Sequence, residues 1–127
     1  MCKIGNFKDI KAWKHGHDLV IEIYKITKLF PKEELFGLTA QMRRAITSVT
    51  ANIAEGMGRY SYKDRVRFFY NSRGSLVEVE NFIFVAKEIG YLNKKDFNKL
   101  DIKVNETKKI LQGLINSTDK IISNFNF

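Results

Sequence analysis

The stretch of this 127-residue chain best suited to binding chemistry is short, basic and aromatic. Four cations and two tyrosines fall within nine residues, in the segment Arg59-Tyr60-Ser61-Tyr62-Lys63-Asp64-Arg65-Val66-Arg67, called the basic turn below. Lys and Arg attract phosphates and tyrosine rings stack on bases, so this combination favours nucleic-acid binding. A solvated helix end explains the same residues without a ligand, and both interpretations stay open. The candidate contacts are Arg59, Tyr60, Tyr62, Lys63, Arg65 and Arg67.

Residues that commonly perform catalysis or hold metals are few in this chain and poorly placed. His15 and His17 are two positions apart, so on a helix they point to different faces. A closed zinc site needs four ligands, usually histidine or cysteine, and Cys2 has no histidine beside it. His17 falls in an apolar stripe, where we expect a hydrogen-bonded core histidine. The sequence therefore predicts no catalytic residue, no metal and no cofactor, in a protein that is not an enzyme.

The composition favours a soluble globular protein with an anionic partner. Hydrophobic residues make up 44% of the chain and charged residues 28%, and the formal net charge is +8, with a sequence pI of about 9.6. Such a basic chain favours RNA or DNA as a partner, although a basic surface kept for solubility is the simpler alternative. No apolar run approaches the ~18 to 20 residues of a membrane-spanning helix, and no apolar signal region follows Met1. We expect one cytoplasmic domain over residues 1–127, with no membrane partner.

Helix breakers divide the chain into four long segments. Pro31 should end the first helix, because proline biases the residue before it away from helical angles. Gly56 and Gly58 suit a left-handed stop for the second helix, and Gly90 should end the third. Short connections imply antiparallel neighbours, so the predicted fold is all-α, an antiparallel up-and-down four-helix bundle. The predicted helices cover residues 9 or 11 to 30, 38–56, 61–89 and 94–123.

Apolar residues recur at helical spacing in each segment. The first segment has two adjoining stripes that make one wide apolar face, the first through Trp13 and His17 and the second through Leu19 and Ile23. The fourth segment repeats apolar or Thr side chains at strict 3-4 spacing, Leu114 included, as in a coiled-coil seam. The second segment should place on one face Leu38, Met42, Ala45, Ile46, Val49 and Ile53.

Charge is spread unevenly between the predicted helices. Residues 35–54 carry only Arg43 and Arg44, and residues 68–86 carry only Arg73, Glu78 and Glu80. A helix in a four-helix bundle has an outer face, so an outer face with almost no charge predicts contact with another subunit. The alternative is a second helix that lies unusually centrally in a monomer.

One run of this sequence resembles a known family. Residues 43–59, RRAITSVTANIAEGMGR, are the most specific part, with support from FKDIKAWKHGHDLVIEIY, FPKEELFGLTAQ and GSLVEVENFIFVAKEIGYL. Together they resemble, over residues 7–92, the small four-helix-bundle family of proteins encoded in 23S rRNA intervening sequences. The accessory variability determinant of diversity-generating retroelements looks like a relative. Thr50 stands where the family usually has proline, so a kink in the second helix stays an open question.

The resemblance implies a homopentamer. In such an assembly five charges of the second and third helices would be paired in a setting with little water. We expect a non-enzymatic oligomer that binds nucleic acid through its basic surface. The alternative is a protein-interaction scaffold whose ligand is another polypeptide, such as the reverse transcriptase of the retroelement relatives. The expected structural charge network is Arg43, Arg44, Arg73, Glu78 and Glu80.

Overall fold

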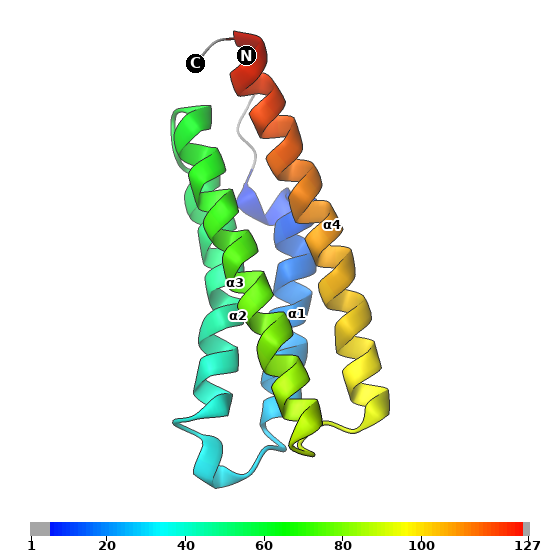
Figure 1. Cartoon of the computed structure of the whole chain (residues 1–127). Helices are drawn as coiled ribbons and strands as arrows, with labels where there is room; N and C mark the ends of the chain where they lie inside the picture. Colours follow the sequence, from blue (N-terminus) through cyan, green and yellow to red (C-terminus); the bar gives the residue numbers. More distant parts are fainter. Residues whose placement is uncertain (1–5, 126–127) are drawn as a thin grey trace.

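The computed structural model describes residues 6–125, and four long helices make up most of this part of the chain (Figure 1). No strand occurs within these residues. The elements in chain order, with η for a short 3-10 helix, are η1 (Phe7–Asp9), α1 (Lys11–Thr27), η2 (Lys32–Glu34), α2 (Leu38–Met57), α3 (Tyr62–Glu88) and α4 (Lys94–Phe125).

The helices form an antiparallel up-and-down bundle. Each helix packs against the next one in the chain, and α4 closes the bundle by packing against α1. The predicted all-α class and bundle architecture are therefore confirmed, and α2 runs through Thr50 as one helix. The α2–α3 connection lies at the upper end of the bundle in Figure 1, while the α1–α2 and α3–α4 connections lie at the lower end. The two ends of the bundle are thus built from different segments.

One apolar core runs along the bundle axis. On α1, Leu19 and Ile23 are fully buried, while Trp13 flanks the core. On α4, Ile115 is fully buried and Leu114 is only partly buried. The helical period of 3.6 residues drifts away from a strict 3-4 seam, which accounts for this shift of one position. Five of the six residues of the predicted α2 face are fully buried, and Leu38 flanks the core. The five are Met42, Ala45, Ile46, Val49 and Ile53.

Two predicted helix ends are wrong. α1 ends at Thr27 and not at residue 30, because the chain before Pro31 tightens into turns in which the Phe30 N–H bonds the Thr27 carbonyl at 3.1 Å. α2 ends with Gly58 at a φ of −81°, so the predicted left-handed stop is absent there. The Gly58 N–H instead bonds the carbonyls of the last helical turn. Gly90 does adopt the left-handed conformation, with a φ of +88°, and ends α3 as predicted.

Gly56 is the place where α2 and α3 come closest. A Cβ atom at this position would lie 2.7 Å from Cε1 of Phe69 and 3.0 Å from the carbonyl oxygen of Arg65. Real Cβ atoms essentially never approach other atoms to 2.7 Å. Phe69 is almost fully buried and cannot move aside without disturbing the core. Glycine at position 56 is therefore required by packing, and it lies inside α2, one residue before the helix ends.

Glu34 joins two connections at the lower end of the bundle. Its Oε1 accepts a hydrogen bond from the backbone N–H of Leu38 at 3.1 Å, at the start of α2. Its Oε2 accepts the hydroxyl of Tyr91 at 2.8 Å, from the α3–α4 connection. Both bonds favour the charged carboxylate, so the backbone bond from Leu38, followed by the bond from Tyr91, lowers the pKa of Glu34 below its ordinary value.

Replacing Gly56 with alanine is expected to destabilise the protein by about 1 to 3 kcal/mol, the usual cost of forcing an extra methyl group into a packed site. Gly113→Ala is the matched control, because a Cβ at Gly113 meets nothing within 4 Å. That change should stabilise the helix by about 0.5 to 1 kcal/mol. Urea unfolding of the two variants measures both effects. A stabilising effect of Gly56→Ala would contradict the close approach of α2 and α3.

Acid should weaken the two hydrogen bonds that Glu34 accepts from Leu38 and Tyr91. A carboxylate with a lowered pKa contributes stability above its ordinary pKa, and this contribution is lost as pH falls through the lowered value. Melting temperatures recorded from about pH 6 down to about pH 3 should therefore fall less in Glu34→Gln than in the natural protein. Glu33→Gln, which removes an exposed carboxylate without a hydrogen bond among residues 6–125, should leave the pH dependence nearly unchanged. Parallel curves for Glu34→Gln and the natural protein would show that the charged carboxylate of Glu34 does not stabilise the fold.

Candidate nucleic-acid interface

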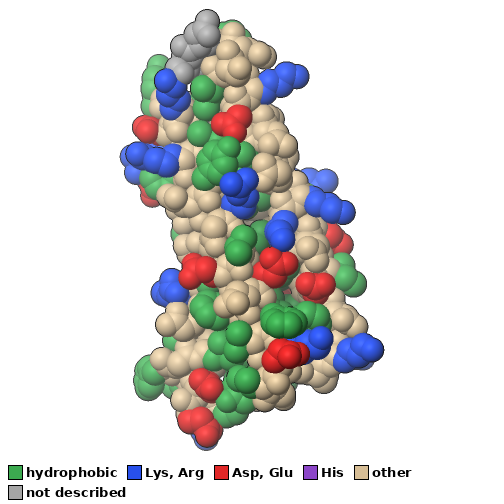
Figure 2. Space-filling model, in the orientation of Figure 1, with side chains coloured by type: hydrophobic (Ala, Val, Ile, Leu, Met, Phe, Trp, Pro, Cys, Tyr) green, Lys and Arg blue, Asp and Glu red, His purple; other side chains and the backbone are tan. Residues whose placement is uncertain are grey.

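The basic turn lies where α2 passes into α3. Ser61 caps α3, because its hydroxyl oxygen accepts a hydrogen bond from the N–H of Asp64 at 3.2 Å, as the sequence predicts. The Nε–H of Arg65 donates to the carbonyl oxygen of Arg59 at 2.8 Å and ties the helix to the chain before it. The six predicted contact residues are thus gathered at one end of the bundle. Figure 2 shows several Lys and Arg side chains around this upper end.

Tyr60 and Tyr62 border a hollow at the basic turn. The hollow has a volume of about 430 Å³ and is also lined by Ser61, Lys63 and Arg65. Tyr60 is 98% exposed and touches almost nothing in the chain. The guanidinium carbon of Arg65 lies 5.0 Å from the centroid of the Tyr62 ring, which holds that cation against one wall. The hollow therefore combines aromatic surface with fixed positive charge.

The arginines at either side of the basic turn already have partners. Arg59 pairs with Glu55 at 2.9 Å and Arg67 pairs with Asp64 at 3.7 Å. Both guanidinium groups also lie over the ring of Phe68, at 4.7 and 5.4 Å from its centroid. These side chains are about half exposed, and such pairs contribute little and open readily. Lys63 has no side-chain partner among residues 6–125.

The ion pairs and ring contacts of Arg59 and Arg67 were not predicted from the sequence. Glu55 lies four residues before Arg59, and Asp64 lies three residues before Arg67, spacings that bring side chains together on a helix. That signal was present in the sequence. Phe68 as a shared platform for two arginines could not be predicted, because Arg59 precedes the first residue of α3. Four cations and two carboxylates give residues 55–67 a net charge of +2.

The predicted network of five charges does not form within the chain. Only one predicted pair occurs, Arg44 with Glu78 at 3.9 Å, and these side chains are 59% and 50% exposed. Arg43 points elsewhere, since successive helical residues diverge by about 100°. Its Nε–H donates to the hydroxyl of Thr27 on α1 at 3.0 Å.

The other two members of that network face α4. Arg73 donates to the side-chain carbonyl of Gln112 at 2.9 Å. Glu80 pairs with Lys108 at 3.1 Å. Their side of α3 therefore closes the seam with α4, whereas Glu78 faces α2.

Residues suited to metal binding or catalysis are scarce among residues 6–125. His17 is exposed and stacks on Trp13, with ring centroids 4.6 Å apart, so the predicted core histidine is wrong. It lies in the stripe of α1 that flanks the core. Cys2 lies outside the described residues. Within residues 6–125, no three side chains of His, Cys, Asp or Glu gather in a group that could hold a metal ion. No helix in this part of the chain is long and apolar enough to cross a bilayer.

Comparisons with known proteins agree with this architecture. The chain is similar to the crystal structure of a protein with unknown function from the S23 ribosomal protein family of Bacteroides thetaiotaomicron VPI-5482, with a TM-score of 0.76 and 20% identity. The match covers 82% of this chain and 97% of that one. At this identity the likeness supports the fold alone. No curated protein matches the chain. The family model described as 23S rRNA-intervening sequence protein matches residues 8–113, and the chain therefore belongs to that family.

Proposed function

We propose that this protein is a non-enzymatic oligomer, a homopentamer, that binds nucleic acid through the basic turn. The observation that carries the proposal is the exposed ring of Tyr60 at the edge of a hollow lined by cations. A large aromatic side chain that is 98% exposed contributes almost nothing to the core. Base stacking gives such a ring a use, at about 1 to 3 kcal/mol per base.

The cations around Tyr60 suit the sugar-phosphate backbone. Lys63 is free to contact phosphate, and the guanidinium of Arg65 is already oriented by its bond to the carbonyl of Arg59. Arg59 and Arg67 lie at the two sides of Phe68 and can exchange their exposed carboxylate partners for phosphate. The combination of a stacking ring with backbone contacts favours unpaired nucleotides over a closed duplex.

Assembly into a ring would repeat this site. The outer surface of α2 and α3 supports a subunit contact, because small and amide side chains dominate it and Arg44 with Glu78 is its only close ion pair among the described residues. The hydroxyl oxygens of Ser48 and Ser75 lie 3.0 Å apart and join the two helices within this surface. We call it the α2–α3 face, formed by Arg44, Ser48, Ala51, Asn52, Asn71, Gly74, Ser75 and Glu78. Several copies of a weak site gain strength from multivalency.

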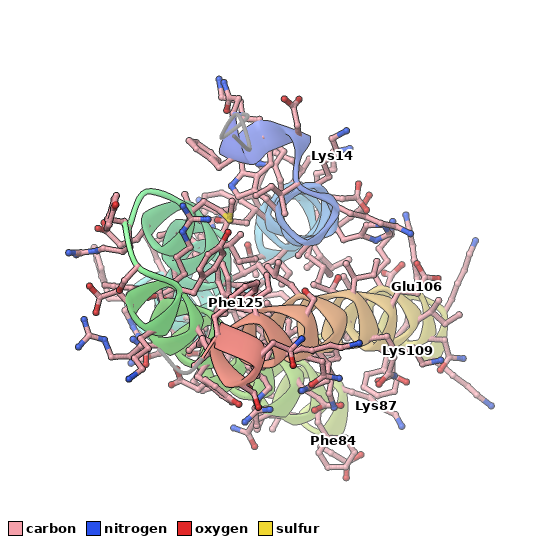
Figure 3. The ribbon with its side chains drawn as sticks, turned by 90° about the horizontal axis from the view of Figure 1, so that it is seen from above. Lys14, Phe84, Lys87, Glu106, Lys109 and Phe125 are labelled. Atoms are coloured by element: carbon pink, nitrogen blue, oxygen red, sulfur yellow. The ribbon has the colours of Figure 1, made fainter. Side chains whose placement is uncertain are left out.

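A second candidate function is a scaffold for another polypeptide. It is favoured by apolar side chains on the outside of α3, where Val77 is 52% and Phe84 is 53% exposed. Viewed along the bundle, Phe84 and Lys87 project away from the core (Figure 3). Phe84 also lines a hollow of about 330 Å³ with Phe97 of α4. A measurement of nucleic-acid binding distinguishes the two functions.

Nucleic-acid binding predicts a specific response at the basic turn. Tyr60→Ala should weaken binding of a single-stranded RNA by about ten-fold, since one stacked base is worth about 1 to 3 kcal/mol, and should affect duplex binding less. Lys63→Gln should flatten the log-log salt slope on single strands by about 0.7. Fluorescence anisotropy at several salt concentrations measures both effects.

A matched control separates a site from general charge. Lys94, Lys95 and Lys109 are exposed lysines of α4 without side-chain partners among residues 6–125. Changing all three to glutamine removes more charge than Lys63→Gln but should leave the affinity within about two-fold, apart from the long-range field. Equal losses of nucleic-acid affinity from both changes would show that the basic turn acts only through the overall charge of the protein. Failure of the natural protein to bind RNA or DNA at low salt would leave the scaffold function.

Assembly is tested by placing a large charge on the α2–α3 face. The natural protein should show a mass near five times the 14.8 kDa of the chain in light scattering. Gly74→Arg should reduce this mass without loss of helicity, since a Cβ at Gly74 meets nothing within 4 Å in the single chain. Gly113→Arg, at an equally open position on α4, should keep the full mass. A natural protein that stays monomeric at all concentrations would rule out the pentamer.

A further inference from the structure

A second hollow lies at the end of the bundle opposite the basic turn. It is formed where α1 ends, η2 crosses and α2 begins, at the lower end in Figure 1, and its volume is about 350 Å³. Three cations line it, Lys28, Lys32 and Arg43, and none of its lining residues is acidic. The rest of the lining includes apolar side chains and two threonines. We call this site the Arg43 hollow.

Arg43 is held in one orientation before any ligand arrives. Its Nε–H donates to the hydroxyl oxygen of Thr27 at 3.0 Å, and the Thr27 hydroxyl in turn donates to the carbonyl of Ile23 at 2.6 Å. The Arg43 guanidinium also lies over the ring of Tyr24, with its carbon 4.6 Å from the centroid. Arg43 forms no ion pair among residues 6–125. Its two terminal NH₂ groups therefore keep their donors for an anion, in the fork that matches a carboxylate.

Thr39 provides a second polar group in the Arg43 hollow. The residue is only 3% exposed and lines the Arg43 hollow. Its hydroxyl forms no hydrogen bond with any described residue, unlike those of the buried residues Thr27, Ser72, Thr107 and Thr118. The hydroxyl oxygen still reaches solvent, because the Nε of Arg59 is the only buried side-chain polar atom without a hydrogen bond among residues 6–125. A ligand oxygen in the hollow can therefore accept a hydrogen bond from the Thr39 hydroxyl.

The remaining surface of the hollow is apolar, and its solvent exposure increases from the inner to the outer side. Phe30 is 6% exposed and closes the inner side, while Leu35 is 50% exposed at the outer side. The side chains of Lys28 and Lys32 are exposed and have no partner among residues 6–125. The hollow thus places an oriented guanidinium beside apolar surface, with two exposed cations on the rim. A nucleic-acid phosphate would use the cations and leave the apolar surface without a partner.

We infer that the Arg43 hollow binds the free C-terminal carboxylate of a polypeptide whose last residue is apolar. The carboxylate accepts from the fork of Arg43 and from the hydroxyl of Thr39. The last side chain lies against Phe30 and Leu35, and the preceding residues pass over the rim near Lys28 and Lys32, which favour acidic neighbours. This site is separate from the basic turn and does not depend on nucleic-acid binding.

An NMR titration of the full chain tests this site directly. The probe is a six-residue peptide of glycine and serine ending in leucine, with a free carboxylate, compared with the same peptide as its C-terminal amide. The acid should shift the Arg43 Nε–H and the backbone signals of Leu35 and Thr39. The amide should bind at least about ten-fold more weakly, because it lacks the charge that makes the bond to arginine strong. Equal binding of acid and amide would overturn the inference.

Variants of the protein separate binding from folding. Arg43→Gln should weaken binding of the acid by about ten-fold, whereas Arg44→Gln, one residue along the same helix, should leave it unchanged. Thr39→Val should also weaken binding, yet its melting temperature should stay about the same, because the Thr39 hydroxyl forms no hydrogen bond with any residue among 6–125. Unchanged affinity in both Arg43→Gln and Thr39→Val would overturn the inference.

Competing ligands test the class of partner. 4-Methylpentanoate carries the same carboxylate and apolar group without a peptide and should bind more weakly than the acid peptide. Inorganic phosphate and a single-stranded oligonucleotide should not shift the Thr39 signals at concentrations where the acid peptide does. Equal affinity for 4-methylpentanoate would assign the hollow to a small carboxylic acid, and tighter binding of phosphate or oligonucleotide would assign it to phosphate. Either result would overturn the polypeptide assignment.

Discussion

The close approach of α2 and α3 near their junction is the constraint on which the rest of the structure depends. Gly56 lets the backbones meet, and no other residue fits there without moving Phe69 or the chain at Arg65. Further along, the buried hydroxyl of Ser72 donates to the carbonyl of Val49 at 2.7 Å, so the two helices are also joined by a bond inside the core. The basic turn inherits its geometry from this contact, since both its ends are fixed by it.

The seam between α4 and α1 is held differently. α4 meets α1 through ion pairs at its edges, with Lys103 against Asp18 at 2.5 Å and Lys99 against Glu22 at 3.4 Å. These pairs lie outside the apolar core and are partly exposed. Exposed pairs set register and orientation more than they stabilise. The bundle thus combines a tightly packed α2–α3 hairpin with helices whose alignment is guided by surface charge.

The parts of the fold that the sequence predicts well are those decided by local chemistry. Ser61 caps α3 and Gly90 ends it, because both depend only on neighbouring residues. His17 was misplaced because two adjoining stripes of α1 have the same period, and only packing against the other helices decides which one is buried. The end of α2 at Gly58 was misjudged for a similar reason, since glycine permits a left-handed turn without requiring it.

The two candidate sites also differ in how well the sequence predicts them. The basic turn is contiguous in sequence, so its residues had to lie together whatever the fold. The Arg43 hollow joins the end of α1 to the first turns of α2, and the bond between Arg43 and Thr27 spans sixteen residues. No periodic pattern shows which of two adjacent arginines finds a hydroxyl on another helix. Arg43 and Arg44 were therefore assigned to one network, although they face different neighbours.

Helix α2 also fixes how far apart the two ends of the molecule can act. Arg43 lies in its second turn and Gly56 in its last, and the rise of about 1.5 Å per residue separates them by about 20 Å along the axis. A straight helix with a fully buried face does not shorten or stretch, so this separation is a property of the fold. A molecule small enough to fill one hollow cannot reach the other. The bundle can therefore act as a rigid spacer that holds two ligands of different chemistry at a set distance.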